Sequence, residues 1–323
     1  MGITGGYGRV LATLGQPPGA AAPGSHVTAS AWFFFTRDVL EVDVPALGLT
    51  GVTDVHIDCP RLEGPNPAYL QSSPEFYMKR LLAAGAGSIF YLGKAYRSGE
   101  LGPRHYPEFT LLEWYRNGWD EHQLMAEVAA LLVEVGVLPA GKTPANTAYR
   151  GIFEQATGMD PVSVDLGSLR RYATKIAARD FSAEERSTCL DLIFSQVVEP
   201  SLPRGVVFVR DYPACQAALA QTGEDERGEE VARRFEVFID GMELANGYFE
   251  LCDVEELRRR FMADNEKRRL SGRAQIPMDE RLLEAMAAGL PACAGVAMGI
   301  DRLLMKAVGA ADIREVLPFA DFA

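Results

Sequence analysis

The sequence predicts an α+β fold in which an antiparallel β-sheet is flanked by helices. Two alternating stretches, 89–97 and 108–116, are predicted to be strands joined by a charged loop. A second hairpin is predicted within 232–253, because Asp240-Gly241 separates two alternating runs and this dipeptide favours a two-residue hairpin turn. Amphipathic segments typical of helices occupy much of the remaining chain.

Composition limits the class of protein. The 323 residues, 48% of them hydrophobic, can bury a core of one large domain or two smaller ones. A net charge of −12 counts against a broad nucleic-acid surface, which needs clustered Lys and Arg. The five cysteines are scattered and form no CxxC pair, which argues against a zinc site or a disulfide framework. With no long apolar run and no signal peptide, we expect a cytoplasmic protein without a membrane segment.

Helices follow from capping and periodicity. Residues 1–25, rich in Gly, Ala and Pro, are expected to be a disordered or loosely ordered tail. Ser73 suits an N-cap, Pro74 the first helical position, and Gly85 the end of a helix. Further helices are expected at 121–135, 146–157, 165–179, 184–198, 255–270 and 279–288, with a strand at 206–213.

The first hairpin carries chemistry on one face. Phe109, Glu113 and Tyr115 alternate along the second strand, where a flat ring suits a stacked base and a carboxylate suits an ammonium. Arg97 and Arg104-His105 offer cations for phosphate oxygens. The residues alone favour the alternative of a surface hairpin with solvated charges.

The second hairpin brings two acids together. Its turn is expected to pair Phe238 with Glu243 and Glu236 with Ala245, so that Glu236 and Glu243 share one face. Two such carboxylates repel each other unless a cation lies between them, and Mg²⁺ combines a few carboxylates with phosphates and water. Two exposed cross-strand acids are an equal alternative.

A family resemblance favours the chemical interpretation. Arg97 followed by a charged loop and RHYPEFTLLEWYR resembles motif 2 of the class II aminoacyl-tRNA synthetases, lysyl branch. The segment 29–45, in which an apolar run leads into a strand expected to end at Pro45, is similar to motif 1, with Asp38 where the family usually has Gly before the strand. Ser73-Pro74-Glu75 is similar to the lysyl-branch SPE segment, and GIDR at 299–302 to motif 3. Within that branch, the chain looks like the stand-alone elongation factor P (R)-β-lysine ligases. The resemblance spans roughly 32–319.

The resemblance implies a class II synthetase-like catalytic domain over 26–323, with a largely helical insertion at about 140–230. Motif 1 implies a homodimer. Arg97 and Arg302 are implied to be catalytic, and Glu236 and Glu243 to bind Mg²⁺. The ATP-binding residues it implies are Arg97, Ser98, Gly99, His105, Tyr106, Phe109, Glu243, Leu244, Gly299 and Arg302.

In motif 2, two positions depart from the family pattern. Gly99 stands where motif 2 has Glu, with Glu100 one place late, so backbone groups of Ser98 and Gly99 are expected to contact the base. Tyr106 replaces the family's Asn after the loop histidine. Both changes touch ATP affinity.

Amino-acid recognition is implied for a third set of residues. Strict alternation would turn Asn246 and Glu250 away from Glu243, so we expect a bulge near Gly247. The implied substrate-binding residues are Ser73, Pro74, Glu75, Glu113, Tyr115, Asn246, Glu250 and Ala297.

The activity implied is ATP-dependent activation of (R)-β-lysine and its transfer to a lysine side chain of elongation factor P. Lysyl-tRNA synthetases usually have Gly where this chain has Ala297, and the added methyl would crowd an α-amino group more than a β-amino group. One alternative is a truncated lysyl-tRNA synthetase using α-lysine; the missing anticodon-binding domain and the acidic charge make tRNA a poor acceptor. The other is a silent paralogue acting as a regulatory binding module, which the retained Arg97, Glu236, Glu243 and Arg302 disfavour.

Overall fold

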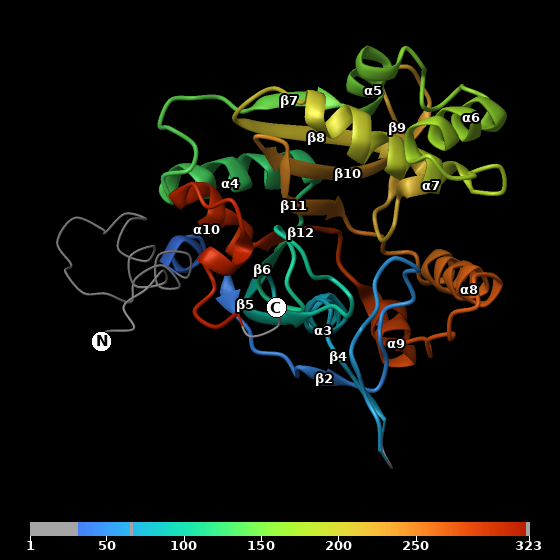
Figure 1. The fold of residues 1–323 in the computed structure, drawn as a ribbon. Helices are drawn as coiled ribbons and strands as arrows, with labels where there is room; N and C mark the ends of the chain where they lie inside the picture. The colour runs from blue at the N-terminus through green and yellow to red at the C-terminus, as the bar shows by residue number, and fades with distance from the viewer. Residues whose placement is uncertain (1–31, 65–66, 321–323) are drawn as a thin grey trace. The chain divides into compact units, whose positions relative to one another are not determined.

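The computed structural model describes residues 32–64 and 67–320 (Figure 1). The chain divides into two compact units: unit 1 comprises the described residues up to Ala140 and from Leu251 onward, and unit 2 comprises Gly141–Glu250. The tail expected at 1–25 lies outside the described residues. The expectation of a single catalytic domain over 26–323 stays a prediction.

Unit 1 is built on a mixed sheet that is mostly antiparallel. The strands β5 (Ile89–Tyr96), β6 (Glu108–Asn117) and β12 (Cys293–Gly299) pair antiparallel in that order, and the short β1 (Leu40–Glu41) pairs parallel with β5. The first predicted hairpin is therefore confirmed, with each strand end within one residue of its predicted position. A small second sheet contains β2 (Leu47–Gly48), β4 (Ala68–Leu70) and β3 (Arg61–Leu62).

One face of the unit 1 sheet is its hydrophobic core. Phe90 and Trp114 are fully buried, and the ring of Phe34 lies 4.8 Å from that of Phe90 and 5.2 Å from that of Trp114. Burying such rings is among the largest favourable contributions that a side chain makes to folding. Phe90 on β5 and Leu112 and Trp114 on β6 are buried even-numbered positions on this face. The odd-numbered positions of both strands point to the opposite face.

The segment resembling motif 1 forms a shorter strand than expected. Residues 32–35 are helical, but the strand predicted to reach Pro45 is assigned only at Leu40–Glu41. Asp38, which stands where the family has Gly, has φ +55. Aspartate tolerates this left-handed conformation better than most residues, so the turn keeps the geometry that glycine would allow.

The helices of unit 1 match the predicted segments closely. In α3, the N-cap is Pro74 and not Ser73, although the Ser73 hydroxyl still accepts the N–H of Glu75 at 3.0 Å. The helices α3 and α9 lie side by side (Figure 1). The bounds are α3 (Glu75–Ala83), α4 (Glu121–Glu134), α8 (Val254–Leu270), α9 (Glu280–Gly289) and α10 (Ile300–Val308). No helix among the described residues combines the length and the hydropathy needed to cross a bilayer.

Unit 2 contains a second group of strands and three helices. The order β11 (Met242–Phe249), β10 (Glu230–Ile239), β8 (Val206–Pro213) is antiparallel; β7 (Ala145–Ala148) pairs parallel with β8, and β9 (Thr222–Glu224) pairs with β10. The helices are α5 (Tyr149–Thr157), α6 (Leu166–Ala177) and α7 (Arg186–Ile193), the last continued by a π-helical turn at Phe194–Val198.

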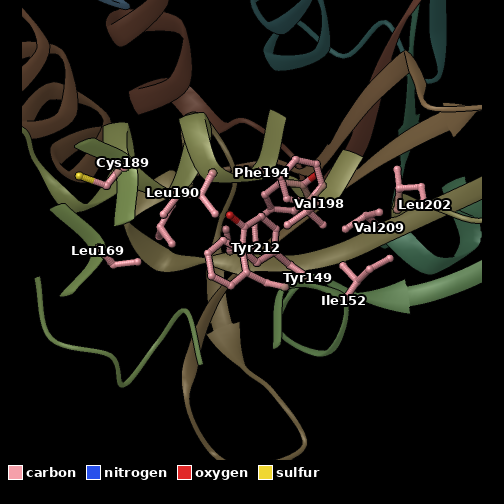
Figure 2. Close-up of a cluster of buried hydrophobic side chains, with 14 of the residues drawn as sticks. Tyr149, Ile152, Leu169, Cys189, Leu190, Phe194, Val198, Leu202, Val209 and Tyr212 are labelled. Atoms are coloured by element: carbon pink, nitrogen blue, oxygen red, sulfur yellow. The ribbon is translucent and has the colours of Figure 1, made fainter. Parts of the chain in front are cut away.

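Aromatic rings join these helices to the strands of unit 2. The ring of Tyr149 in α5 lies 4.9 Å from that of Phe194 and 4.8 Å from that of Tyr212 in β8 (Figure 2). All three side chains are buried. The side of the sheet that carries Tyr212 is therefore covered by the helices.

The turn of the second hairpin is as predicted, but the register beyond it is not. Phe238 pairs with Glu243, whereas Glu236 pairs with Asn246 and not with Ala245. The pairing shifts between Val237 and Phe238, so Leu244 is an extra residue on β11. The expected bulge is thus present at Leu244 and not near Gly247.

This bulge reverses the alternation of β11. Because directly paired residues point to the same face, Asn246 shares a face with Glu236 and, through the Phe238 pair, with Glu243. Gly247 has another role: a Cβ there would lie 2.4 Å from the ring of Phe235, its cross-strand partner. Glycine is therefore needed at position 247, because any side chain would overlap the buried ring of Phe235.

We expect Gly247→Ala to lower the free energy of unfolding by about 1–3 kcal/mol, because the Phe235 ring is fully buried and cannot yield without strain. Urea unfolding measures the effect. The matched control is Gly151→Ala in α5, where an added Cβ meets nothing within 4 Å. That control should be neutral or stabilising by up to about 1 kcal/mol, and equal effects of the two substitutions would contradict the packing argument.

Candidate active site

The odd-numbered face of the unit 1 sheet carries the residues expected to bind substrate. Phe109, Glu113 and Tyr115 follow one another along β6 on this face, as predicted. Small residues lie opposite them on one side or the other: Ala95 is opposite Phe109 on β5, and Ala297 is opposite Glu113 on β12. The β5 neighbour of Glu113 is a larger residue, Tyr91. We call this surface the β6 face. Small flanking side chains leave the aromatic rings and the carboxylate as its main chemical groups.

Glu113 is the central group of the β6 face. It is only 2% exposed, and both of its oxygens are hydrogen-bonded: Ser73 Oγ donates to Oε2 at 2.7 Å and Tyr115 OH donates to Oε1 at 2.7 Å. A buried carboxylate is costly unless it is hydrogen-bonded. Ser73, Glu113, Tyr115 and Ala297 therefore come together in unit 1.

Glu75 has a partner that the sequence reasoning missed. Lys79 Nζ lies 2.6 Å from Glu75 Oε1, and the Lys79 side chain is only 2% exposed against 17% for Glu75. A fully buried ammonium requires such a partner. The signal was present in the sequence, because residues four apart on a helix face one another.

The loop after β5 starts from Arg97. Its guanidinium lies 5.1 Å from the ring centroid of Phe109, and Nη1 is 3.8 Å from Glu100 Oε1. The Nε atom of Arg97 is buried and has no hydrogen-bond partner among the described residues. The family has a glutamate at position 99. In this chain the glutamate is Glu100, and its carboxylate lies beside Arg97.

Two loop residues have clear backbone roles. Gly99 has φ +77, a conformation that favours glycine over glutamate at this position. The N–H of Ser98 donates to the carbonyl oxygen of Asp58 at 2.7 Å. The Ser98 N–H is therefore already hydrogen-bonded within the protein. Contact of the Gly99 backbone with the base stays a prediction.

The motif 3 arginine contacts this same loop. Arg302 Nη2 is 2.7 Å from His105 Nε2, and Arg302 Nε donates to the carbonyl oxygen of Arg104 at 3.2 Å. Because an arginine only donates, His105 Nε2 is the acceptor in this contact. Arg302 and His105, far apart in sequence, therefore come together.

Asp301 positions the start of α10. It is 1% exposed, and its carboxylate accepts the backbone N–H of Thr110 in β6 at 2.6 Å. Burial raises the pKa of Asp301, and the hydrogen bond from Thr110 opposes this rise. At Gly299 a Cβ would make only ordinary contact with Arg302, 3.7 Å away, so packing does not require this glycine.

Tyr106, the other departure from the family pattern, is 4% exposed. Its ring is therefore part of the interior, and its role in ATP binding stays a prediction.

In unit 2, Glu236 is held by an arginine that the sequence reasoning missed. Arg234 Nη2 donates to Glu236 Oε1, and the guanidinium lies 4.4 Å from the Tyr212 ring centroid. Burial raises the pKa of Glu236 to about 7; the charge of Glu243 adds to this rise, while Arg234 and a hydrogen bond from Tyr212 oppose it. The period of two along β10 was the available signal, because it puts Arg234 and Glu236 on one face.

The other expected residues of unit 2 follow on β11. Asn246 pairs with Glu236, and its Oδ1 is buried without a hydrogen-bond partner among the described residues. Leu244 is 2% exposed at the bulge, and Glu250 is 1% exposed. The expected site residues thus form two sets, one in each unit.

Known proteins resemble this chain over most of its length. The family model of the class II tRNA synthetases (D, K and N) matches residues 25–323. A protein of Pseudoalteromonas translucida (strain TAC 125) named elongation factor P–(R)-beta-lysine ligase is 45% identical over 298 residues, covering 89% of this chain and 90% of that protein. Proteins of the same name from Salmonella dublin and Salmonella enteritidis PT4 are 44% identical over 299 residues, with the same coverage. The chain belongs to the class II tRNA synthetase family of the D, K and N type.

Proposed function

We propose that this protein is an ATP-dependent ligase that activates (R)-β-lysine as an aminoacyl-adenylate and transfers it to a lysine side chain of elongation factor P. Family membership supports adenylate chemistry, and the shared name of relatives at 44–45% identity supports the amino acid and the acceptor. The observation that carries the proposal is the β6 face, where aromatic rings and one buried carboxylate lie on a single strand. The N-terminal end of this strand is close to Arg97, whose guanidinium lies 5.1 Å from the Phe109 ring, and to Asp301, the neighbour of Arg302, which accepts the N–H of Thr110.

The proposed chemistry needs no side-chain nucleophile. A carboxylate oxygen of the amino acid attacks the α-phosphorus of ATP, the bond to pyrophosphate breaks, and the acceptor amine later attacks the acyl carbon and releases AMP. Arg97, with its unpaired Nε, would bind the α-phosphate and the substrate carboxylate. His105 and Arg302 would hold the outer phosphates, and Phe109 would stack on adenine. Catalysis is then positioning and charge stabilisation.

Glu113 is the proposed anchor of a substrate ammonium. Its two hydrogen bonds, from Ser73 and Tyr115, hold the carboxylate in one orientation before substrate arrives. A preorganised acceptor avoids the cost of ordering during binding. Glu75 would add an acceptor within unit 1. In unit 2, Asn246 and Glu250 are the residues that the family resemblance assigns to the amino acid, and several acceptors suit a substrate with two amino groups. The buried, unpaired Oδ1 of Asn246 supports this role.

The acidic pair of unit 2 fits a magnesium ion. Glu236 and Glu243 lie on one face, and the charge of Glu243 contributes to the raised pKa of Glu236, so a cation between them would relieve this repulsion. We propose that these two residues hold Mg²⁺. The ion would supply charge neutralisation for the phosphates of ATP. Arg234 holds one oxygen of Glu236 and so orients the carboxylate.

Acceptor, assembly and compartment complete the proposal. A net charge of −12 disfavours tRNA as acceptor and leaves a protein lysine. The exposed side chains of Trp32, Phe35 and Leu40, in the segment resembling motif 1, support a homodimer through that segment. The scattered cysteines are consistent with a reducing cytoplasm.

The proposed function is tested by amino-acid-dependent pyrophosphate exchange, followed by transfer assays. We expect faster exchange with (R)-β-lysine than with α-lysine, and transfer to elongation factor P but not to tRNA. Preference for α-lysine together with charging of tRNA would replace the proposal by a lysyl-tRNA synthetase. Absence of exchange with both amino acids would instead support the alternative of a catalytically silent paralogue that acts as a regulatory binding module.

Ala297 is expected to set the choice between the two amino acids, because its methyl group lies directly opposite Glu113. We expect Ala297→Gly to raise kcat/KM for α-lysine relative to (R)-β-lysine by about tenfold, the usual size of one-methyl discrimination. The KM for ATP should stay unchanged and serves as the internal control. An unchanged ratio would remove Ala297 from the specificity argument.

Glu236 should make the stability of the metal-free protein depend on pH. Its pKa is raised from 4.5 to about 7 in the folded state, so the folded protein binds the proton more tightly than the unfolded chain. The resulting stabilisation is complete below about pH 4.5 and is lost as pH rises through about 7. The loss is at most about 3 kcal/mol, since a tenfold change in proton affinity is worth about 1.4 kcal/mol.

Urea unfolding in EDTA between pH 4.5 and 8 measures this loss. Glu236→Gln should flatten the decline, whereas Glu230→Gln, at an exposed position on the same strand, should retain it. Added Mg²⁺ should restore stability at pH 8 in the wild type but not in Glu236→Gln. Parallel curves for all three proteins would contradict the assignment.

A further inference from the structure

An irregular segment of unit 1, residues 51–60, is held by arginines from the end of α8. Arg268 Nη1 donates to the carbonyl oxygen of Asp54 at 2.8 Å, and Arg268 Nη2 donates to Asp58 Oδ1 at 2.9 Å. Arg273 Nη1 lies 3.1 Å from the other oxygen of the same carboxylate, Asp58 Oδ2. More than 200 positions of sequence separate each pair. The segment has no regular secondary structure. Its carbonyl oxygens therefore need partners outside a helix or sheet, and the arginines provide some of them.

Arg268 is buried, which makes its role more than a surface contact. The residue is 4% exposed, and its Nε donates to the carbonyl oxygen of Ala274 at 2.9 Å. Burying a guanidinium is costly unless its donors are satisfied, and here the planar fork meets backbone and carboxylate oxygens together. A lysine could not reproduce this geometry, because it presents a single point charge.

Asp58 connects this clamp to the candidate active site. Its side chain is held by Arg268 and Arg273, while its carbonyl oxygen accepts the N–H of Ser98 at 2.7 Å. Ser98 directly follows Arg97 and begins the loop that carries His105. A shift of Asp58 would therefore move the first peptide of this loop.

We propose that Arg268 is a positioning residue for ATP binding: through Asp58 it fixes the peptide that follows Arg97 and hence the orientation of the loop at 97–107. This inference rests on the proposed function. Arg268 acts through Asp58 and Ser98 and touches no reacting atom. Positioning errors of about 1 Å are enough to cost an enzyme up to about a hundredfold in rate.

The clamp should affect ATP far more than the amino acid, whose ammonium is proposed to be held by Glu113. Glu113 is held by hydrogen bonds from Ser73 and Tyr115, and these do not involve the segment 51–60. The loop that starts at Ser98, in contrast, carries the groups proposed for the phosphates and the base. A selective loss of ATP affinity therefore distinguishes positioning from general destabilisation.

The test uses two variants of the full chain. Arg268→Lys keeps the charge but loses the fork, and Asp58→Asn weakens the carboxylate contacts while Arg268 keeps its bond to the Asp54 carbonyl. The matched control is Arg269→Lys, whose guanidinium is exposed and pairs with Glu266 on the same helix. The measurements are the dissociation constant of ATP by equilibrium binding, the KM values for ATP and the amino acid in pyrophosphate exchange, and thermal unfolding.

We expect both variants to raise the dissociation constant and the KM for ATP about tenfold, with the amino-acid KM within about twofold of wild type. Arg269→Lys should behave as wild type. Unchanged ATP affinity in the folded variants would overturn the inference, as would equal losses for ATP and amino acid with a lowered melting temperature. If Arg268→Lys fails to fold, the ATP affinity of the milder variant Asp58→Asn decides whether the inference holds.

Failure of the proposed function gives a different result. A wild type that binds ATP but catalyses no exchange contradicts the ligase assignment alone, because ATP binding by the variants is measured without the reaction. A wild type that binds no ATP overturns both.

Discussion

A carboxylate buried on a sheet must be hydrogen-bonded, and this requirement shapes the candidate site around Glu113. The hydroxyls of Ser73 and Tyr115 satisfy its two oxygens, and Ser73 lies at the start of α3, so the helix and β6 are tied together at this point. The cost of leaving such a group unpaired is large compared with the net stability of a protein. The same bonds that permit burial also orient the carboxylate for a ligand.

The requirement recurs at other buried charges of the protein. Lys79 is paired with Glu75, and Arg234 with Glu236. Breaking such a pair is costly because it leaves one buried charge unmatched. The partners are therefore parts of the site even though they need not touch a ligand.

Irregular backbone is controlled by the same means. The segment 51–60 lacks a ladder of its own, and its oxygens are satisfied by Arg268 and Arg273 instead. The Asp58 carbonyl oxygen in turn accepts the N–H of Ser98. The arginines that hold the segment 51–60 therefore also support the loop that begins at Ser98. Loops that carry function are commonly positioned by a rigid element in this way, and here that element is the end of α8.

Sequence reasoning predicted the strand alternation well and the register less well. The odd-numbered face of β6 with Phe109, Glu113 and Tyr115 was predictable because side chains alternate strictly along a regular strand. The pairing of Glu236 was predicted wrongly, because the extra residue at Leu244 follows from packing between strands and leaves no local pattern. Glycine at 247 suggested the bulge, yet it serves the ring of Phe235.

By itself the sequence determined the approximate positions of the helices, the alternation of the strands and the motifs that identify the family, because capping, periodicity and turn residues act over a few positions. It placed some helix ends wrongly: the helix expected to start at 146 starts at Tyr149, after the strand β7, and the helix expected to reach 198 ends at Ile193. Only the tertiary structure decided which charges pair over long distances. Arg302 meets His105, and Arg268 meets Asp58, across about 200 positions, and no local rule specifies such partners. Burial is the physical reason: it removes water from a charged group and thereby selects the one partner that the fold brings within hydrogen-bond reach.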